Sequence, residues 1–577
     1  MMDPLRAYEA AAAELDGGSA LLETRVQAVR ALARGGATDL ALRRFVELGL
    51  EQETGDEDAL ALHGRLLKDR AATLWGGEKK DKLKESASAY KRAYELTGGT
   101  YSGINAATLL LLSGDEVAGI ALAREIGDII DASDTPDDAR DRYFLRATRA
   151  EVLLLCGHNA DASDALGDAI SLYPDGLEER ASTLRQFRRI LQYRDEPLDW
   201  LDPHRPSAIC FFAGRMPDRG NGVVDRRETI DRFCAVIEER GIGVGFGALA
   251  AGGDILFAEA LIASGCELQI VLPSSEESFR AYSVDPFGED WQGRFARCLE
   301  AAAGITITTN DQSLTGDVAI EYAAQLAMGA AIRTANERMS HVYHIVFAPR
   351  GGGLTERLRD VWMSSGRQTE SITIDVDGEH RAPPPSPVPA KDERFLAAML
   401  FADLFRFSEL SHSQVSLAVT HVLSELGEAL RAADGPPTYV NSWGDGIFAV
   451  FEGVEAAADA ALAMQARMRA IDFSALGLPE TLSLRVGAHY GPVSYLDDPI
   501  TGRQSVYGSQ VSQAAKIEPR AVPGSVLVSE AFAAMLALSN NQTFKTSYLG
   551  KFNLDAVDSK VRLFALTSVG SGQGQVR

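Results

Sequence analysis

The spacing of apolar residues divides the chain into three parts. From Met1 to about Tyr193, Ala and Leu recur every three or four residues, and few segments have the pattern of a strand. This spacing places the apolar side chains on one face of successive α-helices. From about residue 205 short apolar runs alternate with helical patterns, and a third part begins near residue 393. The pattern predicts a multidomain protein that starts with an all-α region.

Glycines and one proline turn interrupt the helical part at intervals. The breaks are Gly17-Gly18, Gly35-Gly36, Gly76-Gly77, Gly98-Gly99 and Pro174-Asp175-Gly176. The passages SASAYKRAYELTGGTYSGINAATLLLLSGD and RYFLRATRAEVLLLCGHNADASDALGDAISLYPDG share small residues where two helices would cross. They resemble tetratricopeptide hairpins, whose repeat is about 34 residues. We expect residues 1–200 to form such an array, with a concave surface for a protein partner or a neighbouring domain. A generic helical bundle is the alternative.

Six short apolar runs alternate with helical stretches in the middle part. The predicted strands are Ala208–Ala213, Gly243–Leu249, Leu268–Leu272, Ile305–Thr308, Tyr343–Ala348 and Ser371–Val376. Alternating strands and helices are typical of a doubly wound parallel sheet with helices on both faces. Ligands of such Rossmann-like folds bind where glycine loops follow the carboxyl ends of strands. Residues 205–376 are therefore predicted to form an α/β domain with a ligand site at that edge.

Three glycine loops follow predicted strands in this domain. Their candidate ligand-binding residues are Gly214, Arg215, Gly252, Gly253, Asp254, Arg350, Gly351, Gly352, Gly353 and Thr355. The stretch GALAAGGDILFAEALIASGCELQIVLP, with PRGGGLTERL as a second loop, resembles the SLOG superfamily of Rossmann-like domains. The resemblance implies a sensor for a nucleotide-derived ligand held by backbone amides and arginines. Alternatively, the glycines serve only as turn residues. A hydrolytic role would need an acid or base, for which Asp254 and Glu259 are the candidates.

The overall composition bounds the location and the partners of the chain. With 577 residues it has room for three or four domains. No apolar run approaches the roughly 18 residues of a membrane span, and the first residues are acidic and helical. We therefore expect a cytoplasmic protein without a membrane partner. A net charge of −24 argues against nucleic acid as a partner. The five cysteines have no paired spacing, which predicts reduced thiols.

Proline and glycine mark two segments outside the predicted domains. The stretch DGEHRAPPPSPVPA is rich in proline, which predicts a semi-rigid, extended linker over residues 377–392. The last residues, 570–577, include the run Gly-Ser-Gly-Gln-Gly and are predicted to be a disordered tail. The third domain is therefore expected between these segments, at residues 393–569.

Two aspartates carry the candidate chemistry of the third domain. FLAAMLF is a predicted buried strand that ends at Ala402-Asp403, and Asp445 lies in the hairpin signal Trp443-Gly444-Asp445-Gly446. An Asp beside glycines is by itself typical of a turn. A carboxylate at a strand end and one at a hairpin tip can nevertheless converge on Mg²⁺, which proteins hold with one or two carboxylates plus substrate phosphates.

Four sequence blocks surround these aspartates: FADLFRFSEL, NSWGDGIFAVF, LRVGAHYGPV and VYGSQVSQAAKIEPRAVPGSVLVSE. In this order they resemble the catalytic domain of class III nucleotidyl cyclases, the adenylate and guanylate cyclase family. The resemblance implies a ferredoxin-like α+β domain that acts as a head-to-tail homodimer with active sites at the interface. By matching positions it implies two Mg²⁺ or Mn²⁺ ions at Asp403, Asp445 and the Leu404 carbonyl. It also implies that Phe407 and Ser408 contact the substrate.

Several positions depart from the family pattern. Lys516 stands where the family has a transition-state Arg, and Ser512 where it has a ribose-orienting Asn. Lysine keeps the charge but lacks the planar fork of arginine, and losing one such donor typically costs about 2.7–4 kcal/mol. Asn441 and Ser505 occupy the base-reading positions, where Asn441 matches neither adenine nor guanine readers.

The resemblance implies conversion of a nucleoside triphosphate, with ATP expected, to a 3′,5′-cyclic nucleotide and pyrophosphate in intracellular signalling. One alternative is a CTP or UTP cyclase, as in the bacterial anti-phage pyrimidine cyclases. Another is a degenerate domain that binds a nucleotide as a regulatory module, which the residues at positions 512 and 516 favour. Retention of both aspartates favours catalysis.

Overall fold

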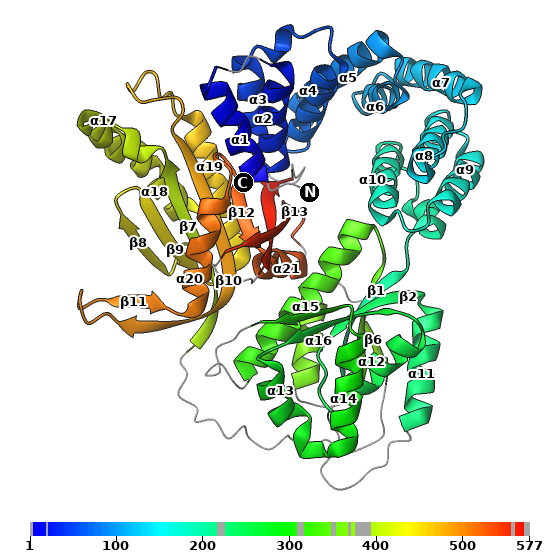
Figure 1. Cartoon of the computed structure of the whole chain (residues 1–577), viewed down its shortest axis with the longest axis vertical. Helices are drawn as coiled ribbons and strands as arrows, with labels where there is room; N and C mark the ends of the chain where they lie inside the picture. The colour runs from blue at the N-terminus through cyan, green and yellow to red at the C-terminus, as the bar shows by residue number, and fades with distance from the viewer. Residues whose placement is uncertain are drawn as a thin grey trace.

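The computed structural model describes residues 4–18, 21–214, 216, 226–308, 317–347, 354–366, 371–374, 394–539, 541–554 and 560–569. These residues form a helical arc, a middle domain around a parallel sheet, and a C-terminal domain around a mixed sheet (Figure 1). The multidomain fold class predicted from the sequence is confirmed. The predicted linker and the predicted tail lie outside the described residues.

The helical arc follows the predicted periodicity. Its helices are α1 (Pro4–Asp16), α2 (Leu22–Arg34), α3 (Thr38–Glu47), α4 (Glu57–Ala71), α5 (Gly76–Thr97), α6 (Thr100–Leu112), α7 (Glu116–Ala132), α8 (Ala139–Leu155), α9 (Asn159–Leu172) and α10 (Leu177–Tyr193). Asp56 and Asp115 begin α4 and α7 as N-caps, each accepting a hydrogen bond from a backbone N–H. The break predicted at Gly76-Gly77 lies slightly earlier, because α4 ends at Ala71 and the two glycines begin α5. Helices α4, α6 and α10 face the inside of the arc (Figure 1).

The middle domain contains all six predicted strands in one parallel sheet. They are β1 (Ala208–Gly214), β2 (Ile242–Gly247), β3 (Glu267–Leu272), β4 (Gly304–Ile307), β5 (Val342–Phe347) and β6 (Ser371–Ile374), in the order β4-β3-β2-β1-β5-β6. The connecting helices are α11 (Arg226–Glu239), α12 (Gly253–Ala263), α13 (Glu276–Ser283), α14 (Glu289–Ala301), α15 (Asp317–Arg338) and α16 (Leu354–Ser364). The strand order reverses between β1 and β5, where such folds place their ligands.

The C-terminal domain has a mixed sheet in the order β13-β14-β12-β10-β7-β9-β8, with β11 paired to β10. Its strands are β7 (Arg394–Phe405), β8 (Tyr439–Trp443), β9 (Gly446–Phe451), β10 (Ser483–Asp497), β11 (Gln504–Tyr507), β12 (Val526–Ser529), β13 (Phe544–Asn553) and β14 (Lys560–Ser568). Its α-helices are α17 (His412–Leu417), α18 (Ser424–Ala432), α19 (Val454–Ala470), α20 (Ser509–Ile517) and α21 (Glu530–Leu538).

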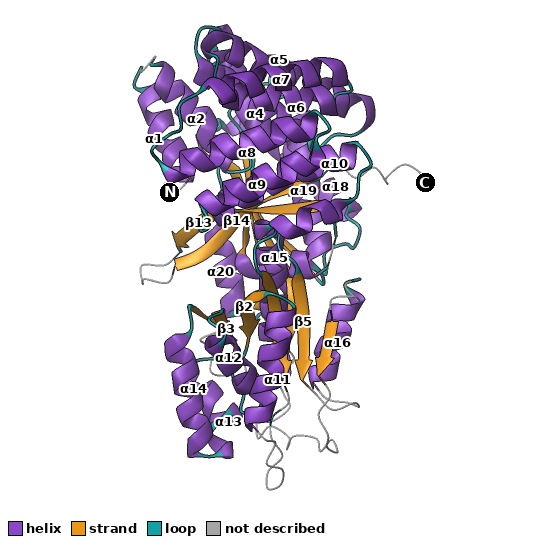
Figure 2. Cartoon of the chain, turned by 90° about the vertical axis from the view of Figure 1, so that its right-hand side faces the viewer, coloured by secondary structure: helices purple, strands orange, loops and turns teal. Residues whose placement is uncertain are grey.

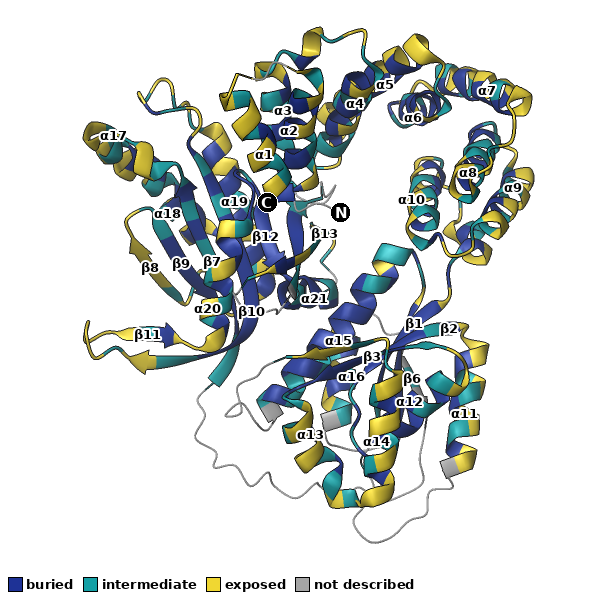
Figure 3. Ribbon diagram, in the orientation of Figure 1, coloured by how far each residue is buried: buried dark blue, intermediate teal, exposed yellow. Residues whose placement is uncertain are grey.

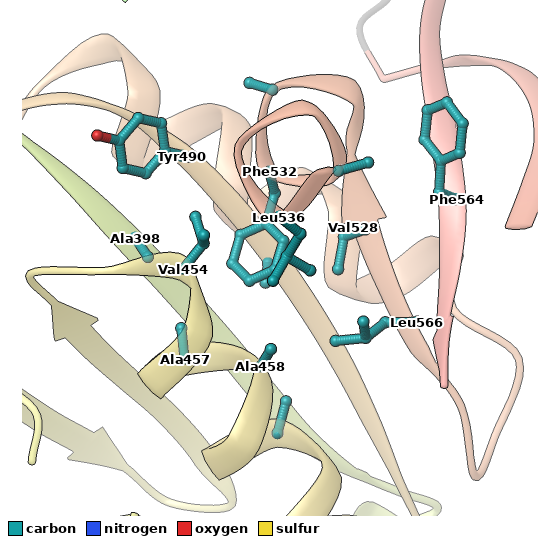
Figure 4. Packing of buried hydrophobic residues seen from close by; sticks show 14 of the residues in the cluster. Ala398, Val454, Ala457, Ala458, Tyr490, Val528, Phe532, Leu536, Phe564 and Leu566 are labelled. Carbon is teal, nitrogen blue, oxygen red and sulfur yellow. The ribbon is translucent and has the colours of Figure 1, made fainter. Parts of the chain in front are cut away.

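The two faces of this sheet are covered differently. On one face, α19 and α21 bury Ala457, Ala458 and Phe532 against strand residues such as Val528 and Leu566 (Figure 4). On the other face, α20 packs in a smaller cluster that also contains residues of β7, β9 and β11. The face with α20 therefore leaves more of the sheet available for a ligand or a partner.

Helix α15 joins the middle domain to the C-terminal domain. It is buried along most of its length (Figure 3), because one side covers β1, β2 and β3 and another crosses α21. Tyr322 Oη donates a hydrogen bond to the Tyr490 carbonyl at 2.9 Å. Arg333 is 4% exposed and pairs with Glu530 at 3.1 Å. The two domains consequently share one hydrophobic core.

The helical arc contacts both other domains and closes a ring (Figure 1). At its start, the short loop after α2 lies against the C-terminal domain, where a Cβ on Gly35 would be 2.5 Å from Val522. At its end, Arg185 of α10 donates to the Glu337 carbonyl of α15 at 2.8 Å. Figure 2 shows the arc at one end of the molecule and the middle sheet at the other. Among the described residues, none of the helices has the length and apolar character to span a bilayer.

Candidate active site

Asp403 lies near the end of β7 and is held there by an arginine. The strand continues to Phe405, so the prediction that it ends at Ala402-Asp403 was wrong by two residues. Asp403 is in register with Arg485 on β10, and Arg485 Nη2 donates to Asp403 Oδ2 at 2.8 Å. A charge-assisted bond of this kind fixes the orientation of the carboxylate. One Asp403 oxygen therefore already has a strong partner.

Asp445 occupies the turn between β8 and β9, as the hairpin signal predicts. Gly444 has φ +68°, a conformation that glycine adopts without strain, and the strands pair up to Trp443 and Gly446. The structure brings the two aspartates into side-chain contact. Burial, followed by the charge and hydrogen bond of Asp403, raises the pKa of Asp445, whereas Arg485 lowers it.

Arg485 also binds a second acid that the sequence analysis missed. Its Nε lies 2.9 Å from Glu518 Oε1 in the short 3₁₀ turn after α20. The turn approaches β10 closely, because a Cβ on Gly487 would be 2.3 Å from the Glu518 nitrogen. Burial raises the pKa of Glu518 to about 7, although Arg485 counteracts it. Arg485 and Glu518 both lie within the sequence blocks around the aspartates. Their place in these blocks was the only signal in the sequence that could have identified them.

Ser512 and Lys516 are one turn apart on α20. Both side chains are exposed, while Ala514 and Ile517 on the same helix are buried. Because residues four apart share a helix face, Ser512 and Lys516 point to the same side. The structure thus presents them together, on the sheet face opposite α19 and α21.

The first helix of the arc reaches the end of α20, a contact that no local sequence pattern indicates. A cavity of about 350 Å³ between them is lined by Leu5, Arg6, Glu9, Ala515, Lys516, Pro519, Arg520 and Leu554. Arg520 Nη2 donates to the Asn553 carbonyl at 3.0 Å, which fixes its position. Lys516 therefore belongs to a surface that the helical arc partly builds.

The candidate base-reading residues lie on neighbouring strands. Asn441 on β8 is exposed, and it shares a strand face with Tyr439 because alternate residues point the same way. Tyr439 Oη lies 3.1 Å from Ser505 Oγ on β11. Tyr439, another residue that the sequence analysis missed, thus links the strand of Asn441 to the strand of Ser505.

The residues after Asp403 differ in what they expose. The Leu404 side chain is buried in the core, so only its backbone can face a ligand. Phe407 packs against the core as well, whereas Ser408 is exposed in the 3₁₀ turn Phe407–Glu409. Ser408 is therefore better placed than the Phe407 ring for contact with a polar substrate.

The two aspartates have the chemistry of a divalent-metal site. Two carboxylates in contact cannot both be ionised at low cost unless a proton or a cation lies between them. Oxygen ligands at a strand end and a turn suit Mg²⁺ or Mn²⁺. The described residues contain no cluster of three or more His, Cys, Asp or Glu side chains that could hold a metal. The pair therefore fits a cation whose remaining ligands come from substrate and water.

In the middle domain, the first two glycine loops meet. A Cβ on Gly214 would lie 2.5 Å from the Gly253 backbone, and Gly252 has φ +102°. Asp254 is buried, and its oxygens accept from the Gly214 and Ala250 amides at 2.6 and 3.2 Å. Asp254 therefore holds the two loops together. Both of its carboxylate oxygens are engaged by backbone amides, so neither is free for a ligand or for acid–base chemistry.

The other candidate residues of the middle domain are less informative. Glu259 pairs with Arg294 at 2.6 Å, which leaves it poorly suited to act as a base. Thr355 lies in the first turn of α16. Arg215, Arg350, Gly351, Gly352 and Gly353 fall outside the described residues. The sensor assignment of this domain stays a prediction.

Asp254 predicts a pH dependence of stability. Burial raises the pKa of Asp254 to about 7, although the Gly214 and Ala250 amides lower it. Because the folded protein holds this proton more tightly than the unfolded chain, stability falls as pH rises from about 4 to about 7. Relative to Asp254→Asn, which cannot ionise, the unaltered protein should lose thermal stability between about pH 4 and about pH 7. If the difference in melting temperature between the unaltered protein and Asp254→Asn were the same at every pH, this prediction would be wrong.

Two family models match parts of the chain. Residues 3–110 match Tetratricopeptide Repeats-Sensor, and residues 391–568 match the adenylate and guanylate cyclase catalytic domain. The helical arc is thus of the tetratricopeptide type at its start, as predicted.

Several solved structures are similar to part of the chain. The guanylyl cyclase Cya2 is 19% identical and covers 32% of this chain and 96% of its own, with a TM-score of 0.27. The adenylyl cyclase CyaB from P. aeruginosa is 17% identical and covers 30% of this chain and 95% of its own, with a TM-score of 0.27. The guanylate cyclase domain of RhGC from Catenaria anguillulae, solved in complex with GTP, is 16% identical. It covers 31% of this chain and 100% of its own, with a TM-score of 0.27. No curated protein matches the chain.

Proposed function

The C-terminal domain is of the adenylate and guanylate cyclase type, and from this premise we propose that the protein converts a nucleoside triphosphate to its 3′,5′-cyclic nucleotide. The supporting observation is the contact between the Asp403 and Asp445 carboxyls. In this reaction the ribose O3′ attacks the α-phosphorus, the bond from this phosphorus to the bridging oxygen breaks, and pyrophosphate leaves. Nucleophile and electrophile belong to one molecule, so correct orientation supplies much of the rate enhancement.

Cyclase catalytic domains generally use divalent metal ions, and we propose two Mg²⁺ or Mn²⁺ ions here. Asp403, Asp445 and the Leu404 carbonyl would hold them. When bound, such ions lower the pKa of the 3′-hydroxyl and neutralise the triphosphate charge. Arg485 keeps Asp403 oriented through its 2.8 Å bond. Arg485 is thus a positioning residue.

The remaining roles fall to exposed polar residues. We assign the phosphates to Lys516, the ribose to Ser512 and the base to Asn441 and Ser505. The Asn441 amide offers both a donor and an acceptor, so it suits several base edges. ATP is the proposed substrate, and CTP or UTP is the alternative. The role of the product in intracellular signalling is part of this proposal.

A direct assay tests the proposal. The full-length protein is incubated separately with ATP, GTP, CTP and UTP in the presence of Mn²⁺, and the products are identified by mass spectrometry. A cyclic nucleotide from one of them supports the proposal and identifies the base. If a dimeric preparation yields no cyclic product from any of the four, the cyclase proposal is wrong.

Exposed apolar side chains support a homodimer through the C-terminal domain. Leu496 on β10 is 54% exposed, and Ile500, in the loop after β10, is 93% exposed. Large apolar residues that lie exposed close together on a surface are typical of a protein–protein interface. The head-to-tail arrangement would place Ser512 and Lys516 of one protomer opposite the aspartates of its partner.

Leu496→Asp is expected to break this dimer. Burying a leucine contributes about 1.5–3 kcal/mol, and a symmetric dimer contains the contact twice. The dissociation constant should therefore rise at least about 100-fold, with a parallel loss of cyclase activity at low protein concentration. Analytical ultracentrifugation measures the first effect. Val117→Asp, at a position on α7 that is 83% exposed, is the matched control and should leave the dimer intact. An unchanged dimer in Leu496→Asp would exclude this interface.

Lys516→Arg is expected to raise kcat by about tenfold. The guanidinium restores a planar, bidentate donor at the phosphate-contacting position. Initial rates at saturating nucleotide measure the effect. Lys551→Arg on β13, also an exposed lysine, is the control and should not alter kcat. A fall in kcat for Lys516→Arg would mean that position 516 does not contact the transferring phosphorus.

The second candidate function is a nucleotide-binding regulatory module. The observation that favours it is the pair Ser512 and Lys516, which lacks the donors of an active cyclase. Nucleotide binding without any cyclic product, measured by calorimetry on the dimer, would select this function.

A further inference from the structure

His489 is a buried histidine to which the proposed reaction gives no role. It lies on β10 and is 2% exposed. Because alternate residues of a strand point to the same face, Gly487, His489 and Gly491 share one face of β10. That face carries α20, since a Cβ on Gly491 would lie 3.0 Å from Gln510 Cγ. A Cβ on Gly487 would clash with the backbone of Glu518, just after α20. His489 is therefore the one side chain of these three between β10 and α20.

Hydrogen bonds join His489 to two helices on opposite faces of the sheet. Its Nε2 lies 2.6 Å from Gln510 Oε1 in the first turn of α20, and its Nδ1 lies 2.7 Å from Ser529 Oγ. Ser529 is the N-cap of α21, where its hydroxyl oxygen accepts from the Phe532 N–H at 3.2 Å. Gln510 and Ser529 are both buried. A buried chain of hydrogen bonds thus connects α21 with α20.

The protons in this chain are donated in one direction. Gln510 Oε1 is an amide oxygen and can only accept, so His489 Nε2 carries a proton and donates it. Burial lowers the pKa of His489 to about 4, although the bond to Gln510 raises it, so the ring is neutral near pH 7. A neutral ring has one such proton, which leaves Nδ1 to accept from the Ser529 hydroxyl. Both ring nitrogens are therefore satisfied, as buried polar groups require.

The first turn of α20 depends on Gln510, because the N-cap residue of this helix is a glycine. Gly508 has no side chain that could accept a hydrogen bond from the first turn. The helix has nine residues, too few to be stable through its own backbone bonds. After its other end, Glu518 lies 2.9 Å from Arg485 of β10. Gln510 and Glu518 thus hold α20 at its two ends.

The start of α21 is in turn held by the middle domain. Glu530, the residue after Ser529, pairs with Arg333 of α15 at 3.1 Å. The same carboxylate oxygen lies 3.1 Å from Arg562 of β14. Arg333 is 4% exposed, so loss of Glu530 would leave a buried charge with less compensation. The position of α15 therefore affects the start of α21, where the chain through His489 begins.

We propose that His489 is a positioning residue, which sets the position of α20 according to the docking of α15. The inference rests on the proposed function, in which Ser512 and Lys516 of α20 contact the ribose and the phosphates. A shift of α20 by about 1 Å would misplace both groups, and misplacement of that size can lower a rate about 100-fold. His489 is buried, so it acts through Gln510 and not by contact with the substrate.

Two substitutions of similar polarity test the role of His489. His489→Gln keeps an N–H near the place of Nε2, so it can still donate to Gln510. His489→Asn is shorter and keeps an acceptor for Ser529, but it has no donor that reaches Gln510. We expect His489→Asn to lower kcat at least about tenfold with little change in KM, and His489→Gln to keep kcat within about threefold. Equal kcat values for the two variants would overturn the proposal.

His204→Asn is the matched control for the loss of a buried histidine. His204 is 5% exposed and also bonds a serine hydroxyl, since its Nε2 lies 2.8 Å from Ser163 Oγ. It lies in the 3₁₀ segment Leu198–His204, outside the C-terminal domain. The variant should lose thermal stability but keep kcat. A loss of kcat as large as that of His489→Asn would assign both losses to destabilisation and overturn the proposal.

Amide hydrogen exchange tests the same link without measuring activity. The amides of α20 should exchange faster in His489→Asn than in the unaltered protein, whereas His489→Gln should leave their exchange unchanged. Unchanged exchange of α20 in His489→Asn would overturn the proposal. If the unaltered protein forms no cyclic product, the cyclase proposal is wrong by itself, and this measurement still decides whether His489 holds α20.

A double-mutant cycle tests the connection to the middle domain. Glu530→Gln removes a charge that pairs with Arg333, so it should speed exchange in α20. In the His489→Asn background, where the chain is already broken, Glu530→Gln should have no further effect. Glu337→Gln is the matched control, because Glu337 lies on α15 itself and pairs with Arg333 at 2.8 Å. Additive effects of the substitutions at positions 489 and 530 would contradict transmission through His489.

Discussion

Asp445→Asn is expected to abolish cyclic nucleotide formation, lowering kcat by at least about 1000-fold. The amide has one neutral oxygen in place of a carboxylate, so Asp403 alone would have to hold the divalent cations. Loss of a single preorganised electrostatic group typically costs about 10²–10³ in rate, and a metal ligand also positions the substrate. Mass spectrometry of the products, with Mn²⁺ and the preferred nucleotide, measures the effect. Asp459→Asn, at an exposed position of α19, is the control and should retain full activity.

The same variant separates catalysis from folding. Burial, and after it the charge of Asp403, raise the pKa of Asp445, so the ionised carboxylate at position 445 is unfavourable in the absence of metal. Neutralising Asp445 should therefore leave the melting temperature of the metal-free protein unchanged or raise it. Loss of activity together with a large drop in melting temperature would mean that Asp445 has a structural role instead. Retained activity would remove the main support for a cyclase.

Gly329→Ala is expected to disrupt the docking of the middle domain on the C-terminal domain. A Cβ at this position of α15 would lie 2.1 Å from the Ala534 carbonyl oxygen of α21. Because backbone atoms cannot move aside locally, the two helices must separate, and overpacking of this kind typically costs about 1–3 kcal/mol. Arg333, buried in the same crossing, would lose its 3.1 Å pairing with Glu530. Calorimetric unfolding should show a lower midpoint or two separate transitions.

Gly167→Ala provides the matched control. Gly167 also lies inside a helix, α9, but a Cβ there would meet no atom within 4 Å. Replacing a helical glycine by alanine without a clash stabilises by about 1 kcal/mol. The two substitutions should therefore shift the melting temperature in opposite directions. A rise for both would show that α15 and α21 do not cross as closely as described.

The crossing of α15 and α21 gives a physical route between the domains. α15 covers the parallel sheet and also reaches the core of the C-terminal domain through Tyr322 and Arg333. A ligand that binds more tightly when α15 is in one position than in another would favour the corresponding arrangement of the cyclase domain. The equilibrium between the two arrangements would shift by the difference in binding free energy. We propose this coupling as the means by which ligand binding in the middle domain would alter the dimer.

Much of the architecture follows from local sequence. Periodic Ala and Leu predict the helices of the arc, and alternating apolar runs predict all six parallel strands of the middle sheet. Gly444 and Asp445 predict the β8–β9 turn, since a turn depends on the conformations of adjacent residues. The sequence blocks around Asp403 and Asp445 likewise indicate the family of the third domain. These features depend on neighbours in the chain, which a single sequence displays.

What the sequence by itself determined was thus the helical character of the arc, the six strands of the middle sheet, the β8–β9 turn and the two candidate aspartates. Only the tertiary structure decided that Arg485 joins Asp403 to Glu518, that α1 lies beside Lys516, and that α15 packs on α21. Each of these arrangements joins residues from distant segments, and their contact depends on how whole elements dock. Docking is governed by the summed shape and burial of many side chains, which no local pattern encodes.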